Sequence, residues 1–441
     1  MDKQKEIVMD FLRQNQMDCE SIDMDQSCKA FIKEMESGLE GESSSLKMIP
    51  TYITMDRDIP IDEPVIVMDA GGTNFRVAVV YFDKDRKPVI EDFKLYPMPG
   101  TKGEISKLEF FTTIARYIEP VLNRSKKIGF CFSYATETLP NKDGRMLQFS
   151  KEVRVKDLIG EVVGENLLNT LKDMGLCGDK KIVMLNDTVA TLLGGKAAYA
   201  DRVFDSYIGF ILGTGTNACY FEENNNIKKV AEIADKEGSM IINMESGGYG
   251  KAERSVVDIE FDNGTVNPGE YSFEKMISGR YQGGMLLALI KKAVKDGLFS
   301  EQFCEKINNI NEITSEEISD FLYYPYSANK LSMCCYDSSP GNKSGDHLVL
   351  YYLIDSIIER AAKLVTINIA SIIIKTGSGK NPCAPVCVTA EGATFYKSKL
   401  FKSKLEYYVK KYLNDEKELF CEFVKAEDAT LIGAAIAGLL N

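Results

Sequence analysis

Hydrophobic and polar residues alternate along the chain with two different periods, and these periods separate helices from strands. The first 45 residues repeat apolar positions at helical spacing and end in the polar run GESSS, which predicts a helical arm followed by a break. From residue 65 the apolar runs become short and rich in β-branched residues, as in VIVMD and FRVAVVYF. Such runs are typical of buried strands.

The middle of the chain alternates strands with helices. Strands are predicted at 126–134 and 181–187, and a helix is predicted at 156–173. A second strand, loop and strand follow at 207–222, and the second half adds long apolar helices, such as one over 347–374. This alternation is typical of an α/β protein. Because 441 residues exceed the usual size of a single hydrophobic core, we expect two domains.

Composition argues against several classes of protein. The formal net charge is -12, and the lysines and arginines form no long block, so we expect no nucleic-acid partner. The longest apolar stretches, 364–374 and the C-terminal LIGAAIAGLL, are shorter than the ~20 residues that cross a bilayer. The N-terminus does not resemble a secretory signal. We therefore expect a cytoplasmic protein without a membrane partner.

The cysteines and the single histidine limit the chemistry that the chain can perform. Eleven cysteines without regular spacing are typical of buried thiols in a reducing compartment. Cys334 and Cys335, or Cys383 and Cys387, have no second pair or histidine at zinc-ligand spacing, so no metal site is expected there. His347 lies in the polar stretch SSPGNKSGDHL, which predicts a solvated histidine in a surface loop. Acid-base chemistry is therefore expected from carboxylates.

A carboxylate and two glycines separate two of the predicted strands. Asp69 is followed by Gly71, Gly72, Thr73 and Asn74, and the next residues are again strand-like, which predicts a hairpin turn. Two interpretations are open here: an ordinary glycine hairpin, or a loop whose bare backbone approaches a polyanion. In the second, a carboxylate beside phosphates requires an intervening cation such as Mg²⁺.

A second loop of similar composition favours the phosphate interpretation. Gly213, Thr214, Gly215, Thr216 and Asn217 again stand between strand-like runs. The two loops are about one domain apart in the sequence, which predicts two domains of related plan that each supply a phosphate loop across a cleft.

Further segments extend this pattern into a resemblance to the hexokinase family. The two loops resemble the family's phosphate motifs. GFCFSY, FSKE, LNDTVATLLGG, INMESGGYG and FEKMISGRY resemble its sugar segments, and VCVTAEGATFYKS and AEDATLIGAAIAG resemble its last nucleotide segments. The resemblance implies an α/β, two-domain actin-like ATPase (ribonuclease H-like) fold with a cleft between a small and a large domain. We expect the small domain at 62–189 plus 428–441 and the large domain at 1–61 plus 190–427.

The resemblance also implies a reaction, the transfer of a phosphoryl group from MgATP to the C6 hydroxyl of glucose or a related hexose. The implied catalytic residues are Asp187 as base and the cations Lys151 and Arg76. The implied sugar-binding residues are Ser133, Ser150, Lys151, Asn186, Asp187, Asn217 and Glu245. The implied ATP-binding residues are Asp69, Gly71, Gly72, Thr73, Asn74, Gly213, Thr214, Gly215, Gly392, Thr394 and Gly433, with Asp69 holding Mg²⁺ through water.

Asp187 is also favoured by the hydrophobic pattern itself. It ends the apolar run KIVML and begins a helical run, and α/β proteins place ligand-binding groups at that position. The other interpretation is that Asp187 or Thr188 caps the helix.

The chain departs from the family pattern mainly in the sugar segments. Tyr134-Ala135 replaces a usual Phe-Pro, Glu152 a glycine, Ser246 a tryptophan, Gly284 a glutamate and Ile432 a lysine. The missing carboxylate at Gly284 predicts weak glucose binding or poor discrimination of hexoses that differ at C1 and C2.

Two other functions stay open, a sugar sensor without catalysis and an actin-like ATPase that drives a partner. The presence of Asp69, Lys151 and Asp187 together argues against a sensor, because a sensor does not need catalytic residues. The sugar segments argue against a partner-driving ATPase, because such a protein does not bind sugar.

Overall fold

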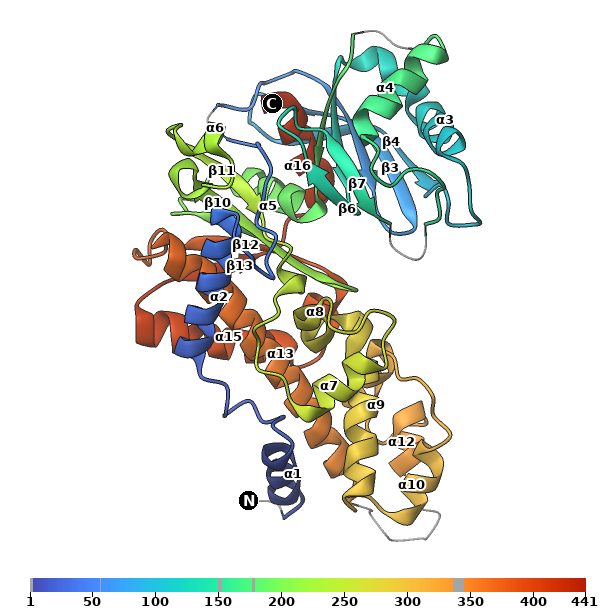
Figure 1. The fold of residues 1–441 in the computed structure, drawn as a ribbon, viewed down its shortest axis with the longest axis vertical. Helices are drawn as coiled ribbons and strands as arrows, with labels where there is room; N and C mark the ends of the chain where they lie inside the picture. The colour runs from blue at the N-terminus through green and yellow to red at the C-terminus, as the bar shows by residue number, and fades with distance from the viewer. Residues whose placement is uncertain (1–2, 56, 150–152, 177–178, 336–344) are drawn as a thin grey trace.

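The structure is a computed structural model that describes residues 3–55, 57–149, 153–176, 179–335 and 345–441. Ser150 and Lys151, which the resemblance assigns to the sugar and the phosphoryl group, lie outside the described residues, as does Glu152. Figure 1 shows an elongated molecule with one main β-sheet in each of two lobes, and the N-terminus at the far end of the larger, helix-rich lobe.

The smaller lobe contains a five-stranded sheet. In sheet order its strands are β4 (Pro88–Pro97), β3 (Asn74–Phe82), β2 (Val65–Ala70), β5 (Lys127–Phe132) and β8 (Lys181–Leu185). The sheet is accompanied by α3 (Lys107–Ile118), η1 (Glu119–Arg124), β6 (Ala135–Thr138), β7 (Gly144–Gln148), α4 (Val163–Asp173), α5 (Asp187–Ala198) and α16 (Ala429–Leu440). Strands β2 and β3 form an antiparallel hairpin, whereas β2, β5 and β8 run parallel.

The residues of β2 explain why this sheet is buried on both faces. Ile66 and Met68 belong to the same hydrophobic core as α3 and α4, whereas Val65 and Val67 belong to a second core with α5 and α16. Successive side chains of a strand point to opposite faces, so an uninterrupted apolar run is needed to fill both cores.

The larger lobe contains a six-stranded sheet with a similar plan. In sheet order its strands are β1 (Ile49–Pro50), β11 (Ser239–Asn243), β10 (Thr216–Glu223), β9 (Tyr207–Leu212), β12 (Val386–Glu391) and β13 (Cys421–Val424). As in the smaller lobe, an antiparallel hairpin, here β9 with β10, is followed across the sheet by parallel strands, here β12 and β13. Both glycine loops therefore occupy hairpin turns, as predicted.

Helices make up the rest of the larger lobe. They are α1 (Lys3–Gln14), α2 (Met24–Glu40), η2 (Asn224–Asn226), α6 (Ala231–Ala234), η3 (Ser246–Gly248), α7 (Val256–Asn263), α8 (Ser272–Ile277), α9 (Gly279–Lys295), α10 (Glu301–Ile307), α11 (Ser315–Tyr323), α12 (Lys330–Cys335), α13 (Asp346–Thr376), α14 (Ala393–Lys397), α15 (Phe401–Tyr408) and η4 (Val409–Glu416). The 31-residue α13 is buried along most of its length.

Helices α5 and α16 form the layer between the two sheets (Figure 1). α16 packs on β2 and β5, α5 packs on β9 and β12, and the two helices pack against each other. A Cβ atom at Gly433 of α16 would lie 1.9 Å from the main-chain oxygen of Ala190 in α5, so only glycine allows this close approach. We propose the sequence-based domain boundaries as the limits of the two lobes, with α5 crossing the boundary at residue 189.

Two local predictions are wrong. The helix predicted at 156–173 begins only at Val163, because the preceding turn includes Asp157 with φ 58° and Gly160 with φ 86°, which are not helical angles. His347 is not a solvated loop residue: it lies in α13 and is 9% exposed. Its ring lies 4.7 Å from that of Tyr326, and burial lowers the pKa of the imidazole.

The cysteines agree with the sequence-based prediction of buried thiols. The cysteines of the described residues are free thiols, and most of them are buried. Across the same residues, no helix has both the length and the apolar character that a membrane span requires.

Candidate active site

The parallel strands of the smaller sheet bring three of the predicted site residues to one edge. Asp69 of β2 is in register with Cys131 of β5, and Cys131 is in register with Leu185 of β8. Ser133 and Asp187 each follow two residues later in the chain. Both therefore emerge at the carboxyl ends of their strands beside Asp69, the position where α/β sheets commonly bind ligands.

Asp187 is the first residue of α5, but the cap of this helix is its neighbour. The side chain of Asn186 is the N-cap and accepts a hydrogen bond from the Thr188 N–H at 2.9 Å. The same N–H lies 2.8 Å from Asp187 Oδ1, and the Ser133 hydroxyl donates to the Asp187 carboxylate. These contacts fix the orientation of the carboxylate and leave capping to Asn186.

The pKa of the Asp187 carboxyl is raised to about 6. Burial is the largest cause, followed by the negative charge of Asp69, with a smaller contribution from Glu245. Hydrogen bonds from Thr188 and Ser133 act in the opposite direction. A carboxylate whose pKa lies closer to neutrality is a stronger base than an ordinary one.

The first glycine loop is closed at its base and exposed at its tip. The Gly71 N–H donates to the Asn74 oxygen at 3.0 Å, and the Met98 N–H donates to the Thr73 oxygen at 2.9 Å. Gly72, Thr73 and Asn74 are exposed, and a Cβ atom at Gly72 would have no neighbour within 4 Å. The tip therefore offers main-chain donors to solvent, as a phosphate loop requires.

Asp69 stands at the base of this loop and is 2% exposed. Its Oδ2 accepts hydrogen bonds from the Arg76 guanidinium and from the Thr430 hydroxyl, the latter at 2.9 Å. Arg76 Nη2 also donates to Thr430 Oγ1 at 2.8 Å. The sequence did not single out Thr430, although it lies within the segment AEDATLIGAAIAG. The predicted metal carboxylate and the predicted catalytic cation are thus in direct contact.

The second glycine loop is held by the predicted sugar segment FEKMISGRY and by the segment predicted to bind the adenosine. The Gly213 oxygen accepts hydrogen bonds from the Gly279 N–H and from the Thr394 hydroxyl, each at 2.9 Å. Gly392 has φ 114°, and a Cβ atom there would lie 2.2 Å from the Leu212 oxygen. Gly392 and Thr394 therefore lie beside the second loop, whereas Gly433 lies where α16 packs against α5, and its contact with the nucleotide stays a prediction.

The two predicted sugar residues of the larger lobe are connected by an asparagine that the sequence did not indicate. Asn217 Nδ2 donates to Asn243 Oδ1 at 2.7 Å, and Asn243 Nδ2 donates to Glu245 Oε1 at 2.8 Å. Asn217 Nδ2 also lies 3.5 Å from Oδ1 of Asn186. Asn243 ends β11 and is 5% exposed, so this buried side chain fixes the positions of Asn217 and Glu245.

Glu274 is a carboxylate beside the second glycine loop that the sequence did not indicate. Its Oε2 accepts a hydrogen bond from the Thr216 N–H at 3.0 Å, which places it beside the second loop. Burial raises the pKa of its carboxyl, and the nearby charge of Glu245 adds to the effect. It lies in FEKMISGRY, in the short helix α8, which also carries the buried Lys275, and no local pattern singled it out.

Gly284 lies on α9, which packs against α7. A Cβ atom at Gly284 would lie 2.6 Å from the ring of Phe261, so this side of α9 packs against α7. The ring of Phe261 leaves little space for a longer side chain at this position, and the effect of the missing carboxylate on hexose binding stays a prediction. Ile432 is likewise buried in the hydrophobic core shared by α5 and α16.

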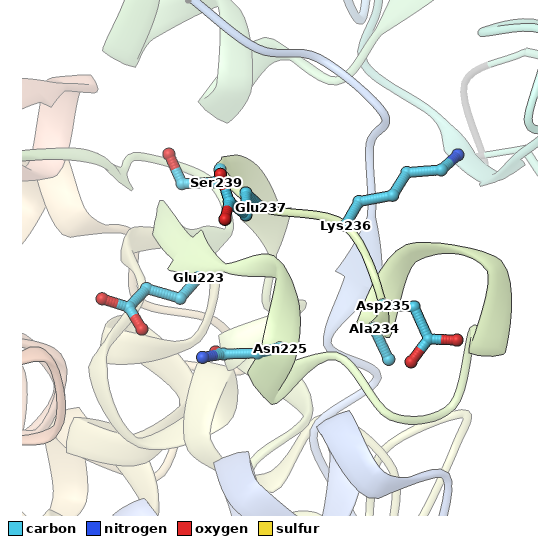
Figure 2. A pocket seen from close by; sticks show the side chains of 8 residues that line it. Glu223, Asn225, Ala234, Asp235, Lys236, Glu237 and Ser239 are labelled. Atoms are coloured by element: carbon cyan, nitrogen blue, oxygen red, sulfur yellow. The ribbon is translucent and has the colours of Figure 1, made fainter.

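A separate hollow of about 480 Å³ lies where β10 ends and β11 begins, at the end of β10 that is away from the second glycine loop (Figure 2). Its lining includes Glu223, Asn225, Asp235, Lys236, Glu237 and Ser239. Glu223 ends β10, whereas the second glycine loop precedes Thr216 at the other end of that strand. The hollow includes none of the predicted site residues.

The residues at the small-lobe edge fit a magnesium ion that arrives with a nucleotide. Across the described residues, no group of three or more His, Cys, Asp or Glu side chains is arranged to bind a metal. Mg²⁺ seldom needs such a cage, because it commonly uses one or two carboxylates together with phosphates and water. Asp69 supplies one carboxylate beside an exposed loop of main-chain donors.

The fold matches that of known sugar kinases. A hexokinase from Schistosoma mansoni, solved in complex with glucose, superposes with a TM-score of 0.77 at 24% identity and covers 99% of each chain. The structure therefore has the two-domain actin-like ATPase fold.

Sequence comparison then identifies the family. The hexokinase family models match residues 8–197 and residues 207–440, and the second match alone exceeds half of the chain. The chain belongs to the hexokinase family, whose members are ATP-dependent phosphotransferases that act on hexoses.

Similar relatives occur in plants and animals. Hexokinase-5 of Oryza sativa subsp. japonica is 29% identical over 435 residues, covering 92% of this chain and 84% of the relative. Human hexokinase-3 is 28% identical over 418 residues, covering 92% of this chain and 44% of the relative. The chain thus spans less than half of that human protein.

Proposed function

We propose that the protein transfers the γ-phosphoryl group of MgATP to the C6 hydroxyl of glucose or a closely related hexose. The observation that carries this proposal is the position of Asp187. Its carboxylate has a pKa of about 6, is oriented by Ser133 and Thr188, and emerges at the sheet edge that also bears Asp69 and the first glycine loop.

In the proposed reaction, Asp187 orients the C6 hydroxyl and accepts its proton. Phosphoryl transfer passes through a loose transition state in which positioning matters more than early proton removal. Thr188 and Ser133 supply that positioning by fixing the carboxylate.

The sugar would be recognised mainly from the larger lobe. Asn217, Glu245 and Glu274 offer both donors and acceptors, and Asn186 adds an amide from the start of α5. A sugar hydroxyl that lost such a partner in a dry site would cost about 1–3 kcal/mol. The two carboxylates provide charge-assisted hydrogen bonds, which are stronger than neutral ones.

The nucleotide would lie between the two glycine loops. The exposed N–H groups of Gly72 and Thr73 face one end of the phosphate chain, and the loop at Gly213, with Gly392 and Thr394, faces the other end and the adenosine. Bound magnesium would neutralise charge on the phosphates, with Asp69 as its protein ligand through water. Arg76 and Lys151 are the proposed cations for the moving phosphoryl group.

A coupled assay for ADP release, with and without a panel of hexoses, tests this proposal. Glucose, mannose, fructose and 2-deoxyglucose with MgATP should include at least one sugar that stimulates turnover strongly. ADP release that does not depend on sugar would indicate an ATPase that drives a partner. Sugar binding without any turnover would indicate a sensor.

A further inference from the structure

Tyr134 connects the first glycine loop to the body of the smaller lobe. It stands between β5 and β6, is 4% exposed and belongs to the hydrophobic core under α3 and α4. Its ring contacts those of Phe132 and Phe149, with centroids 5.0 and 5.1 Å away. The ring is therefore fixed by packing, and its hydroxyl has a defined position.

That hydroxyl reaches the main chain of the loop. Tyr134 Oη donates a hydrogen bond to the Gly71 oxygen at 2.8 Å and lies 3.5 Å from the Gly72 oxygen. The preceding residue acts in parallel, since the Ser133 N–H donates to the Ala70 oxygen at 3.1 Å. Two consecutive residues thus hold two consecutive carbonyl groups at the start of the loop.

The direction of the Gly71 carbonyl determines the direction of the next N–H group. In a planar trans peptide, the C=O of one residue and the N–H of the next point in opposite directions. Because the Gly71 oxygen points inward to Tyr134, the Gly72 N–H points outward to the exposed side of the loop. A peptide between two glycines rotates easily because neither residue has a Cβ atom.

We propose that Tyr134 is a positioning residue for ATP, whose hydroxyl keeps the Gly71–Gly72 peptide oriented so that the Gly72 N–H can bind a phosphate oxygen. This inference rests on the proposed function, because it takes the first loop as a phosphate site. It assigns a role to a position where the family usually has phenylalanine, which can pack in the same core but cannot hold the carbonyl.

The test is Tyr134→Phe, which keeps the ring and removes only the hydroxyl. One lost neutral hydrogen bond corresponds to about a two- to tenfold effect. We expect the KM for MgATP and the Kd of the non-hydrolysable analogue β,γ-imido-ATP to rise by that factor, with little change in the KM for the hexose. Hydrogen exchange of peptides covering residues 68–76 should become faster in the protein without ligand.

Tyr199→Phe is the matched control. The Tyr199 hydroxyl also donates to a main-chain oxygen, that of Lys425, at 2.9 Å, but it lies at the far end of α5 from Asp187. This variant should leave both nucleotide constants and the exchange of 68–76 unchanged.

The outcomes separate the inference from the proposed function. Unchanged analogue binding and unchanged exchange in Tyr134→Phe would overturn the role of Tyr134, even if the wild type phosphorylates hexoses. Weaker analogue binding in Tyr134→Phe, together with a wild type that lacks turnover on any hexose, would support the role of Tyr134 and reject the proposed reaction. A wild type that binds no nucleotide would reject both.

Discussion

The guanidinium of Arg76 donates to the carboxylate of Asp69, so a basic residue already neutralises the side chain proposed to hold magnesium. Thr430 joins the pair: its hydroxyl donates to Asp69 at 2.9 Å and accepts from Arg76 at 2.8 Å. The three side chains come from β2, β3 and α16. The C-terminal helix therefore helps to set the geometry of the proposed metal site.

Thr430→Val should weaken the use of magnesium without changing sugar binding. Valine has nearly the same shape, but it removes the hydroxyl that aligns Asp69 and Arg76. A hydrogen bond to a charged group contributes about 1.5–3 kcal/mol, so we expect kcat/KM for MgATP to fall about ten- to a hundredfold. A titration of free Mg²⁺ at fixed ATP should show a higher half-saturating concentration.

Thr191→Val makes the same substitution at another position and serves as the control. Thr191 is fully buried in α5, and its hydroxyl has no hydrogen-bond partner among the described residues. Its replacement should leave the magnesium titration unchanged and should not lower the melting temperature. If Thr430→Val behaves in the same way, Thr430 has no part in the alignment of Asp69.

Asp187→Asn should abolish sugar phosphorylation while the protein still binds the hexose. Asparagine can accept the Thr188 hydrogen bond but cannot take up the proton, so the loss should appear in kcat more than in the sugar Kd. Calorimetric titration with the best hexose and a coupled ADP assay measure the two effects separately. Retention of most of the wild-type kcat would exclude Asp187 as the base.

The raised pKa of Asp187 also predicts how activity and stability depend on pH. Activity should fall below about pH 6, the value to which the pKa is raised, because the protonated carboxyl cannot act as base. Between pH 3.8 and about 6 the folded protein binds a proton at Asp187 that the unfolded chain has already released. Stability therefore falls as the pH rises through this range, and above it the buried charged carboxylate lowers the stability of the fold. Asp187→Asn should therefore melt at a higher temperature than wild type at pH 7.5.

The stability difference should shrink as the pH falls through 6 toward 4, because the wild-type carboxyl then becomes neutral as well. Thermal melts of both proteins across this range measure it. Asp173→Asn, an exposed position at the end of α4, is the control and should show no such trend. A gain for Asp187→Asn that is the same at pH 4 and pH 7.5 would contradict the linkage.

The sequence predicted the parts of the site that depend on local pattern. Asp69 and the first loop follow from a strand, glycines and a second strand, and Asp187 follows from a strand that passes directly into a helix. These features are set by neighbouring residues, so hydrophobic periodicity is enough to find them. The same reasoning located Gly213 in a hairpin turn of the larger sheet.

The residues that the sequence missed depend on contacts between distant segments. Thr430 reaches Asp69 across 361 positions of the chain, and Glu274 reaches Thr216 across 58. No local pattern shows which face of α8 or α16 turns toward the site. The prediction that His347 is a solvated loop residue was wrong for a related reason. Its polar neighbours in the sequence do not reveal the aromatic rings that lie beside it in the fold.

The two lobes should close when the sugar binds. ATP held beside bulk water would be exposed to hydrolysis, so a site that is completed only around the alcohol favours transfer. The helices α5 and α16 are the layer across which the lobes would move. Small-angle X-ray scattering should show a smaller radius of gyration with saturating hexose, and an unchanged profile would argue against closure. The chain contains no tryptophan, so intrinsic tryptophan fluorescence cannot report this motion.

Glu274, rather than position 284, should control the affinity for the hexose. Glu274→Gln keeps a side-chain oxygen for the Thr216 N–H but removes the charge, and the loss of a charge-assisted hydrogen bond should weaken sugar binding about ten- to a hundredfold. Glu270→Gln, an exposed neighbour, should change little.

Gly284→Glu should not improve glucose binding, and it should destabilise the fold by about 1–3 kcal/mol, because the new side chain meets the ring of Phe261. Calorimetric titration with glucose and thermal melts of the three variants check these outcomes. Tighter glucose binding in a stably folded Gly284→Glu variant, with unchanged binding in Glu274→Gln, would show that the second sugar carboxylate belongs on α9.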